Sequence, residues 1–284
     1  MESLALLHPA ALYTLVVVFG LLIGSFLNVV ILRVPEALFH EWRCQCRELL
    51  ELEPEQTPAP ASVATGRSRC PACRQPIAWY DNIPLLSWIA LRARCRRCDA
   101  PISARYPAVE ALTALLSLIV IVQLGPTVAG LAGLVFTWML IAASGIDLEH
   151  KLLPDQFTLP LIWAGLALNL FGIFSDLQSA VIGAIAGYLV LWLVFHLFRL
   201  ATGKEGMGFG DFKLLSAIGA WFGWQVLPTV ILLASAVGAI VGLSLIAARK
   251  MGREVPIAFG PFLAAAGWLV LISGQRIVDF WLIF

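Results

Sequence analysis

Eight runs of apolar residues, separated by short polar connections, dominate the chain. A helix needs about 20 apolar residues to cross a bilayer. The runs predict membrane-spanning helices near residues 10–32, 107–124, 128–146, 157–174, 179–199, 212–225, 228–248 and 256–273. The sixth is the shortest and contains Lys213, so it is either tilted or only partly embedded. We therefore expect an all-α polytopic membrane protein with about eight transmembrane helices.

The composition agrees with this pattern. The 284 residues are 60% hydrophobic and 13% charged, and the mean hydropathy is +0.87, which excludes an ordinary soluble domain. No basic residue precedes the first apolar run and no small-residue cleavage site follows it, so we expect a retained span and not a signal peptide. No internal repeat is evident. The predicted organisation is a first span over 1–32, a polar domain over 33–106 and a transmembrane core over 107–284.

The distribution of basic residues predicts the orientation. Eleven of the nineteen Lys and Arg residues lie between Arg33 and Arg105. If this region is cytoplasmic, eight spans place the connections 147–156, 200–211 and 249–255 on the same side. Only Arg276 then lies outside, as the tendency of positive charge to remain in the cytoplasm requires. We therefore expect a multi-pass membrane protein whose polar domain lies in the cytoplasm.

All six cysteines lie in the polar domain. Cys70 and Cys73 form one C-x-x-C motif, Cys95 and Cys98 form a second, and residues 74–94 separate the two. Paired motifs of this kind bring four thiolates to one tetrahedral zinc ion. A redox-active dithiol and unliganded cysteines are the alternatives. Zinc is favoured, because a reducing cytoplasm disfavours disulfides.

Other parts of the polar domain carry weaker signals. Cys44 and Cys46 belong to neither motif and are interpreted as incidental. Residues 47–65 are acidic and rich in Pro and Ala, which predicts a flexible excursion. The arginines around the C-x-x-C motifs fit a zinc knuckle, and they could also contact anionic lipid headgroups or an acidic partner.

Two aspartates are predicted to share one depth in the membrane. Asp147 follows the third apolar run and Asp211 precedes the sixth, so both lie at the cytoplasmic ends of their helices. An ionisable side chain at membrane depth is costly and usually functional. Asp155 follows a proline and is interpreted as the N-cap of the fourth span. Glu149 and His150 are interpreted as solvated loop residues.

A pair of carboxylates suggests a specific chemistry. Two close carboxylates cannot both ionise cheaply, so such a pair shares a proton. The ionised member can take a proton from water, and the protonated member can polarise a peptide carbonyl. This is the chemistry of aspartic proteases. Ion-coupled transporters also place acids at helix breaks, so aspartates alone do not decide between the two.

Three glycines stand directly before Asp211, at positions 206, 208 and 210. Glycine lets another backbone approach closely, so Gly208 and Gly210 are candidate substrate-binding residues. A nucleotide or S-adenosylmethionine loop would follow a strand, whereas this segment follows a membrane helix. A P-loop is excluded because Glu205 follows Lys204, where Ser or Thr is required.

Two further polar residues lie inside predicted spans. Asn28 ends the stretch Gly24-Ser25-Phe26-Leu27-Asn28, and small or polar residues of this kind pack transmembrane helices together. A direct role for Asn28 in a site is the alternative. Glu110 falls in the first turns of the second span, where an acid favours the helix dipole. The alternative is that Glu110 lines a polar site at the cytoplasmic face.

Together these motifs resemble the type IV prepilin peptidases, which are bifunctional leader peptidases and N-methyltransferases of the Gly-x-Gly-Asp class of intramembrane aspartic proteases. The resemblance runs nearly from end to end and is weakest over 47–65. It is carried by residues 24–28, both C-x-x-C motifs, and residues 82–88, 102–110, 147–155, 206–213 and 256–262.

The resemblance implies that Asp147 and Asp211 are the catalytic pair and that Asp211 ends the Gly-x-Gly-Asp motif. It implies cleavage of a short basic leader after a glycine at the cytoplasmic face. The new N-terminal residue, usually phenylalanine, would then be methylated with S-adenosylmethionine. The cysteine-rich loop is associated in this family with zinc and with methylation. No donor-binding residues can be assigned from the sequence.

The expected partners are prepilins of type IV pili, pseudopilins of type II secretion and membrane lipid, with no nucleic acid. Two other functions stay open. One is a peptidase without methyltransferase activity. The other is an ion-coupled transporter with a zinc-stabilised cytoplasmic domain, against which stand the lack of repeats and the position of both acids away from the midplane.

Overall fold

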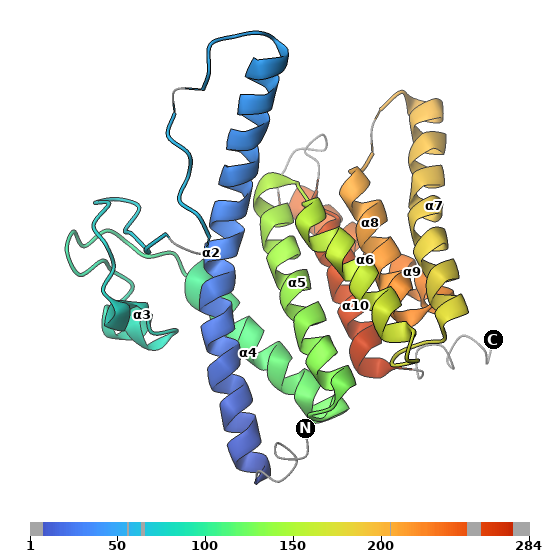
Figure 1. Ribbon diagram of the computed structural model, residues 1–284, viewed down its shortest axis with the longest axis horizontal. Helices are drawn as coiled ribbons and strands as arrows, with labels where there is room; N and C mark the ends of the chain where they lie inside the picture. The colour runs from blue at the N-terminus through green and yellow to red at the C-terminus, as the bar shows by residue number, and fades with distance from the viewer. Residues whose placement is uncertain (1–7, 56, 64–65, 205, 249–256, 275–284) are drawn as a thin grey trace. The chain divides into compact units, whose positions relative to one another are not determined.

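The computed structural model describes residues 8–55, 57–63, 66–204, 206–248 and 257–274 (Figure 1). Its elements are α2 (Pro9–Leu49), η1 (Trp79–Asn82), α3 (Leu86–Ala90), α4 (Arg105–Leu124), α5 (Val128–His150), α6 (Asp155–Asn169), α7 (Leu177–Thr202), α8 (Phe209–Phe222), η2 (Trp224–Val226), α9 (Leu227–Ala247) and α10 (Gly260–Ser273). The only β-pairs in the described ranges are two isolated bridges. The predicted all-α class is confirmed. The chain divides into two compact units, Glu2–Ile119 and Val120–Phe284.

Every predicted span coincides with a helix, although the helices differ in length. Five stretches are long and apolar enough to cross a membrane, and they comprise α2, α4, α5, α7 and the segment Trp224–Ala247. The other three apolar helices, α6, α8 and α10, have 15, 14 and 14 residues. The count of eight crossings therefore stays a prediction. The connection 249–255, with three of the basic residues used for the orientation, lies outside the described residues.

The first helix is longer than expected. The sequence predicts a span that ends near residue 32, but α2 continues through Pro35 to Leu49. Its 41 residues correspond to about 60 Å, roughly twice the thickness of a bilayer core. The hydrophobic pattern marks only the part that lipid can surround, so it does not reveal a helix that continues into water.

In the unit Glu2–Ile119, α2 packs closely against α4 through small residues. A Cβ atom on Gly20 would lie 2.7 Å from Ala114 Cα, and a Cβ on Gly24 would lie 2.6 Å from Glu110 Cα. One turn further, the Asn28 side chain donates a hydrogen bond to the Tyr106 carbonyl at 3.0 Å. The interpretation of this stretch as a helix-packing motif is confirmed.

In the unit Val120–Phe284, α8 forms the centre and packs against α6, α7 and α10 (Figure 1). From Asp211 to Trp221, every residue except Lys213 is buried. Trp221 donates from its indole N–H to the Leu161 carbonyl on α6, and Asn169 on α6 donates back to the Ala220 and Trp221 carbonyls. These polar contacts fix the position of α8 against α6.

The contact between α7 and α8 is made by backbone against backbone. Gly183 on α7 faces Gly219 on α8, and a Cβ on either would collide with the carbonyl of the other. One turn along α7, a Cβ on Gly187 would lie 2.7 Å from the Leu215 carbonyl. Without a hydrophobic effect between helices in lipid, small residues at such crossings supply the close van der Waals contact that holds helices together.

Candidate functional site

Asp147 lies in the last turn of α5 and is 5% exposed. Its Oδ2 accepts a hydrogen bond of 3.0 Å from the backbone N–H of Gly260. Gly260 is the first residue of α10, so this N–H has no partner within its own helix. The start of α10 thus holds one carboxylate oxygen of Asp147.

Asp211 lies in the first turn of α8 and is 6% exposed. Gly208 caps this helix, and its carbonyl accepts a hydrogen bond of 3.2 Å from the Asp211 backbone N–H. The Asp211 side chain turns back toward the Gly208 backbone, as in a capping box. The other carboxylate oxygen, Oδ1, is buried and has no hydrogen-bond partner among the described residues.

The fold brings these two aspartates together. They interact electrostatically, although 64 positions separate them in the sequence. Each occupies a helix end inside the same unit, as the sequence predicts. A fixed carboxylate beside one with an unpartnered oxygen is suited to holding a water molecule and polarising a peptide carbonyl.

Leu153 links the helix starts around the pair. It is buried between two glycines of different helices. A Cβ on Gly210 of α8 would lie 2.5 Å from Leu153 Cβ, and a Cβ on Gly260 of α10 would lie 2.9 Å from a Leu153 methyl carbon. Gly210 is therefore required by packing. Gly208 differs, since among the residues that the structure describes the nearest neighbour of such a Cβ would be Asp211 Oδ2 at 3.9 Å, which leaves open space above Gly208 in that part of the chain.

Three expectations for the α5–α6 connection need correction. Asp155 is not an N-cap, because α6 begins at Asp155 and Pro154 occupies the cap position. Its carboxylate instead accepts a hydrogen bond from Lys213, which explains how a lysine fits beside the start of α8. Glu149 and His150 are exposed, but they belong to the last turn of α5 and not to a loop, because α5 continues past Ile146.

A candidate metal centre lies in the unit Glu2–Ile119. The sulfur atoms of Cys70, Cys73, Cys95 and Cys98 all lie within 4.8 Å of one another, as the two C-x-x-C motifs predict. The Sγ atoms of Cys70 and Cys98 are 3.8 Å apart. Bonds of about 2.3 Å in a tetrahedron would separate sulfur atoms by roughly this distance. The four thiols therefore fit one metal ion.

The local backbone favours the metal-binding form of one ligand. Hydrogen bonds from the backbone N–H groups of Cys73 and, more weakly, Ala72 lower the pKa of the Cys70 thiol to about 6, although burial opposes this shift. A thiolate is the form that binds metal.

The two knuckles are copies of one short structure. In the first, the Cys70 N–H bonds to the Gln75 carbonyl and Arg69 pairs with Pro76. In the second, the Cys95 N–H bonds to the Ala100 carbonyl and Arg94 pairs with Pro101. The expectation of no internal repeat is wrong at this scale. The spacing C-x-x-C-x-x-P-I, present at both places in the sequence, is the signal that could have revealed it.

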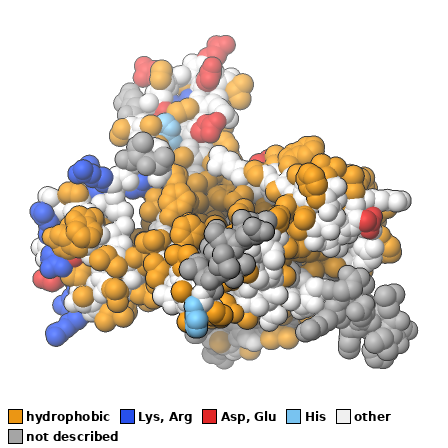
Figure 2. Space-filling model, turned by 60° about the horizontal axis from the view of Figure 1, so that its bottom comes forward, with side chains coloured by type: hydrophobic (Ala, Val, Ile, Leu, Met, Phe, Trp, Pro, Cys, Tyr) orange, Lys and Arg blue, Asp and Glu red, His pale blue; other side chains and the backbone are white. Residues whose placement is uncertain are grey.

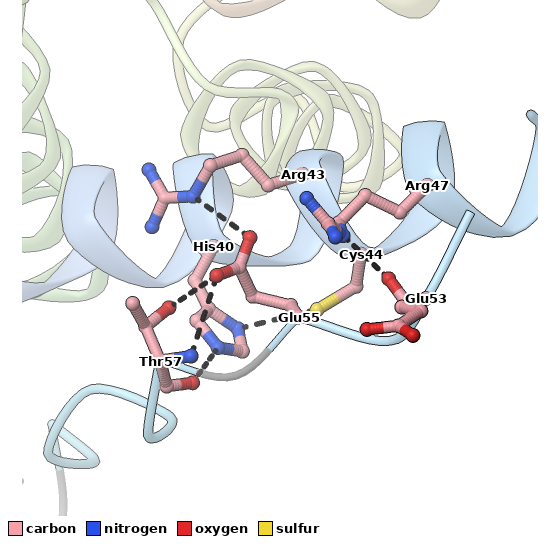
Figure 3. A network of polar contacts seen from close by, with 7 residues as sticks. All are labelled: His40, Arg43, Cys44, Arg47, Glu53, Glu55 and Thr57. Atoms are coloured by element: carbon pink, nitrogen blue, oxygen red, sulfur yellow. Dashed lines mark hydrogen bonds and ion pairs between the residues drawn. The ribbon is translucent and has the colours of Figure 1, made fainter.

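The end of α2 carries a polar network that is separate from the metal centre (Figure 3). His40 and Cys44 lie one helical turn apart, with 3.7 Å between Nδ1 and Sγ, and the His40 ring contacts the Thr57 carbonyl. Arg43 lies 3.8 Å from a Glu55 carboxylate oxygen. The excursion predicted over 47–65 therefore starts as helix and then runs back along α2. Cys44 contributes to this network and not to the metal site.

Comparison with known proteins decides the family. The profile described as "Type IV leader peptidase family" matches residues 134–243, and that of the "Bacterial Peptidase A24 N-terminal domain" matches residues 18–124. This chain is 54% identical over 275 residues to the prepilin leader peptidase/N-methyltransferase of Aeromonas hydrophila, covering 96% of this chain and 95% of that one. The chain belongs to the type IV leader peptidase family.

Other members of the family show the same extent of similarity. The proteins of that name from Stutzerimonas stutzeri and Pseudomonas aeruginosa are each 50% identical over 277 residues, covering 98% of this chain and 96% of theirs. No solved structure matches the chain. Both aspartates of the pair fall inside the matched peptidase region.

Gly260 is the site residue that sequence reasoning missed. The stretch 256–262 contributed to the family resemblance, but neither its spacing nor its composition connects Gly260 with Asp147, 113 positions away. The only available signal was a glycine before a proline at the start of an apolar run.

Replacement of Gly260 by alanine tests this contact. The added Cβ would lie 2.7 Å from Asp147 Oδ2, so it must displace the carboxylate. We expect kcat for leader cleavage to fall by roughly 100-fold, because a shift of about 1 Å in a reacting group has an effect of this size.

Gly267→Ala is the matched control on the same helix, where the three atoms nearest to the new methyl group would all belong to the side chain of Ile218. It should keep kcat close to the wild-type value. Unchanged kcat in Gly260→Ala, measured on correctly inserted protein, would contradict the assigned role.

Proposed function

We propose that this chain cleaves the leader from prepilins with the Asp147–Asp211 pair and then methylates the new N-terminus with S-adenosylmethionine. The observation that carries the proposal is that the two buried aspartates meet within a chain similar over nearly its full length to named prepilin leader peptidase/N-methyltransferases. Pseudopilins of type II secretion are included as substrates, because they would present the same kind of leader.

The cleavage step needs only groups that the pair supplies. The two carboxylates share one proton in this scheme, since two buried carboxylates that interact electrostatically cannot both ionise cheaply. Asp147 is held by the Gly260 N–H and accepts a proton from the attacking water. Protonated Asp211 donates the shared proton from its unpartnered oxygen to the oxygen of the peptide carbonyl as water adds to the carbon. As the C–N bond of the resulting tetrahedral intermediate breaks, Asp147 passes the proton taken from water to the leaving nitrogen, and Asp211 recovers its proton when the new carboxyl group forms. Neither a nucleophilic side chain nor a metal ion takes part in this scheme.

The location of the site supports a substrate that approaches from the cytoplasm. We propose eight crossings in a bacterial inner membrane, with the ends of α5 and α8 that carry the aspartates at the cytoplasmic face. The bias of basic residues toward that side supports this orientation. The domain limits 1–32, 33–106 and 107–284 remain part of the proposal, with the observed α2 extending beyond the first limit.

Gly208 is proposed to admit the extended substrate backbone beside Asp211. Gly210 was a second candidate, but its contact with Leu153 accounts for that glycine. Backbone torsions of φ −87° and ψ 154° at Gly208 are open to any residue, so packing and conformation do not explain a glycine there. Close approach of the substrate backbone would explain a glycine at this position.

Gly208→Val therefore isolates the substrate-side role. The variant should insert with a thermal midpoint close to that of the wild type, while leader cleavage is abolished because the side chain fills the space above Asp211. Gly210→Val should differ by losing thermal stability as well, through its clash with Leu153. Full cleavage activity in Gly208→Val would refute the role assigned to Gly208.

Zinc is proposed as the metal of the four-cysteine centre. Four thiolates in a closed set suit structural zinc, which supplies rigidity and no open coordination position for catalysis. Cys70, Cys73, Cys95 and Cys98 would hold the ion and join the two knuckles. The residues that bind S-adenosylmethionine are not assigned.

Metal analysis tests this centre. Purified protein should contain about one zinc per chain, and Cys70→Ser/Cys98→Ser should contain none. Proteolysis between residues 66 and 104 should be faster in the double variant, because the knuckles lose their cross-link. Cys44→Ser/Cys46→Ser is the matched control and should keep its zinc. Metal retained by the first variant would exclude the four-cysteine site.

One assay tests the function as a whole. Detergent-solubilised enzyme is incubated with a prepilin, with and without S-adenosylmethionine, and the mass of the product is measured by mass spectrometry. Loss of the leader is expected in both reactions, with a further ~14 Da from one methyl group only when the donor is present. Cleavage without the methyl shift would favour a peptidase alone. No cleavage, together with ion flux in liposomes, would favour the transporter.

A further inference from the structure

A cluster of large apolar side chains is exposed on the cysteine-rich part of the unit Glu2–Ile119. We call it the η1–α3 patch, and its members are Trp79, Tyr80, Ile83, Leu86 and Ile89. Trp79 is 81% exposed, and Leu86 and Ile89, which are three positions apart on α3, are 66% and 65% exposed. Exposed apolar side chains gathered in this way mark an interaction site.

A buried carboxylate fixes the depth of this patch along α4. The Leu85 backbone N–H, directly before α3, donates to Glu110 Oε2 at 2.8 Å, and Glu110 is 7% exposed. Glu110 stands five positions after the first residue of α4, about 7.5 Å along the helix axis. The dipole role expected for Glu110 is wrong, because α4 begins at Arg105 and has no acidic residue in its first turn. Glu110 instead holds the Leu85 backbone.

A second contact ties α3 to the residues that lead into the same helix. The indole N–H of Trp88 donates to the Ile102 carbonyl at 3.2 Å. Leu85 itself adopts φ 59° and ψ −50°, a conformation that is unfavourable for leucine. Since α4 is one of the helices able to cross the membrane, α3 lies level with the first turns of a membrane span.

Basic residues follow the patch directly. Arg92, Arg94, Arg96 and Arg97 are all exposed, and Arg96 forms an ion pair of 2.6 Å with Asp81 of η1, which leaves the other three to contact anionic headgroups. A hollow of about 570 Å³ is lined by Ala90, Arg92, Arg94, Arg96 and Asp99, among other residues. Figure 2 shows Lys and Arg side chains next to hydrophobic ones at the edge that carries α3 in Figure 1. Apolar and aromatic side chains flanked by arginines are typical of surfaces that lie in the headgroup region of a bilayer.

We infer that the η1–α3 patch is a membrane-interface anchor, with its apolar side chains at the boundary of the acyl chains and its arginines on anionic lipid headgroups. Lipid is favoured over a protein partner because the Glu110 contact places the patch at the level where a membrane helix begins. The anchor would hold the metal-binding knuckles at the bilayer surface. This inference does not depend on the proposed enzymatic function.

Photo-crosslinking in lipid nanodiscs tests the anchor on the full chain. A diazirine-bearing amino acid is placed at position 86, 89 or 50, one position at a time, in discs of phosphatidylethanolamine and phosphatidylglycerol. Leu50 is the matched control, being 68% exposed in the same unit but about 30 Å along α2 from Asn28, which bonds to the start of α4. Lipid adducts at 86 and 89 should exceed those at 50 by about tenfold or more.

A second variant checks that the apolar side chains are responsible. With the crosslinker at position 79, Leu86→Asp/Ile89→Asp should reduce the lipid adduct at least severalfold, while the metal content of the protein shows that the knuckles remain folded. Lipid adducts no more frequent at 86 and 89 than at 50 would overturn the inference. Crosslinks that form mainly to residues 120–284 of the same chain, or to added prepilin, would also overturn it. They would identify the patch as a protein-binding surface.

Discussion

The arrangement of the two aspartates that we propose as the catalytic pair depends on the burial of one short helix. Helix α8 has 14 residues and is enclosed by α6, α7 and α10, so its N-terminal turn, which carries Asp211, has little freedom to move. Glycines make this enclosure possible, because the backbones of α7 and α8 touch at Gly183 and Gly219. Apolar side chains gain no free energy by moving from lipid into the protein interior. Close backbone contacts of this kind therefore provide much of the stabilisation available to the helices. The position of the carboxylate thus follows from backbone packing along the whole length of α8.

The same principle extends to the second aspartate. Asp147 is fixed by the unpaired N–H at the start of α10, and Leu153 fills the space between α8 and α10 through contacts with two glycines. The starts of α8 and α10 and the end of α5 therefore converge on the pair. The backbone of these helices determines where the two carboxylates lie. The open space above Gly208 is the exception in this packed region, which is why we place the substrate there. Rigid surroundings on one side and space for a peptide on the other suit the hydrolysis that we propose for this pair.

Much of the fold, and the residues of both candidate sites except Gly260, could be predicted from the sequence. Membrane helices require long apolar runs, so their existence was evident, and charge bias supplied an expected orientation. The four cysteines were recognisable because metal geometry constrains their spacing. Asp147 and Asp211 were recognisable because an acid at the end of an apolar run is costly. The contact between Gly260 and Asp147 could not be predicted, since it depends on how α5 and α10 pack. The extent of α2 was missed because its last turns lie beyond the apolar pattern, and Asp155 was mistaken for a cap because its pairing with Lys213 is a tertiary contact.

The most direct test of the account is the rate of leader cleavage in Asp147→Asn and Asp211→Asn. Asparagine preserves the shape of each side chain and removes the ionisable group. We predict that either variant inserts normally but cleaves prepilin roughly 10²–10⁴-fold more slowly. The double variant should be no worse than the single variants, because the two aspartates act as one unit. A pilin whose leader has already been removed should still be methylated. Normal cleavage by either single variant would show that the pair is misassigned.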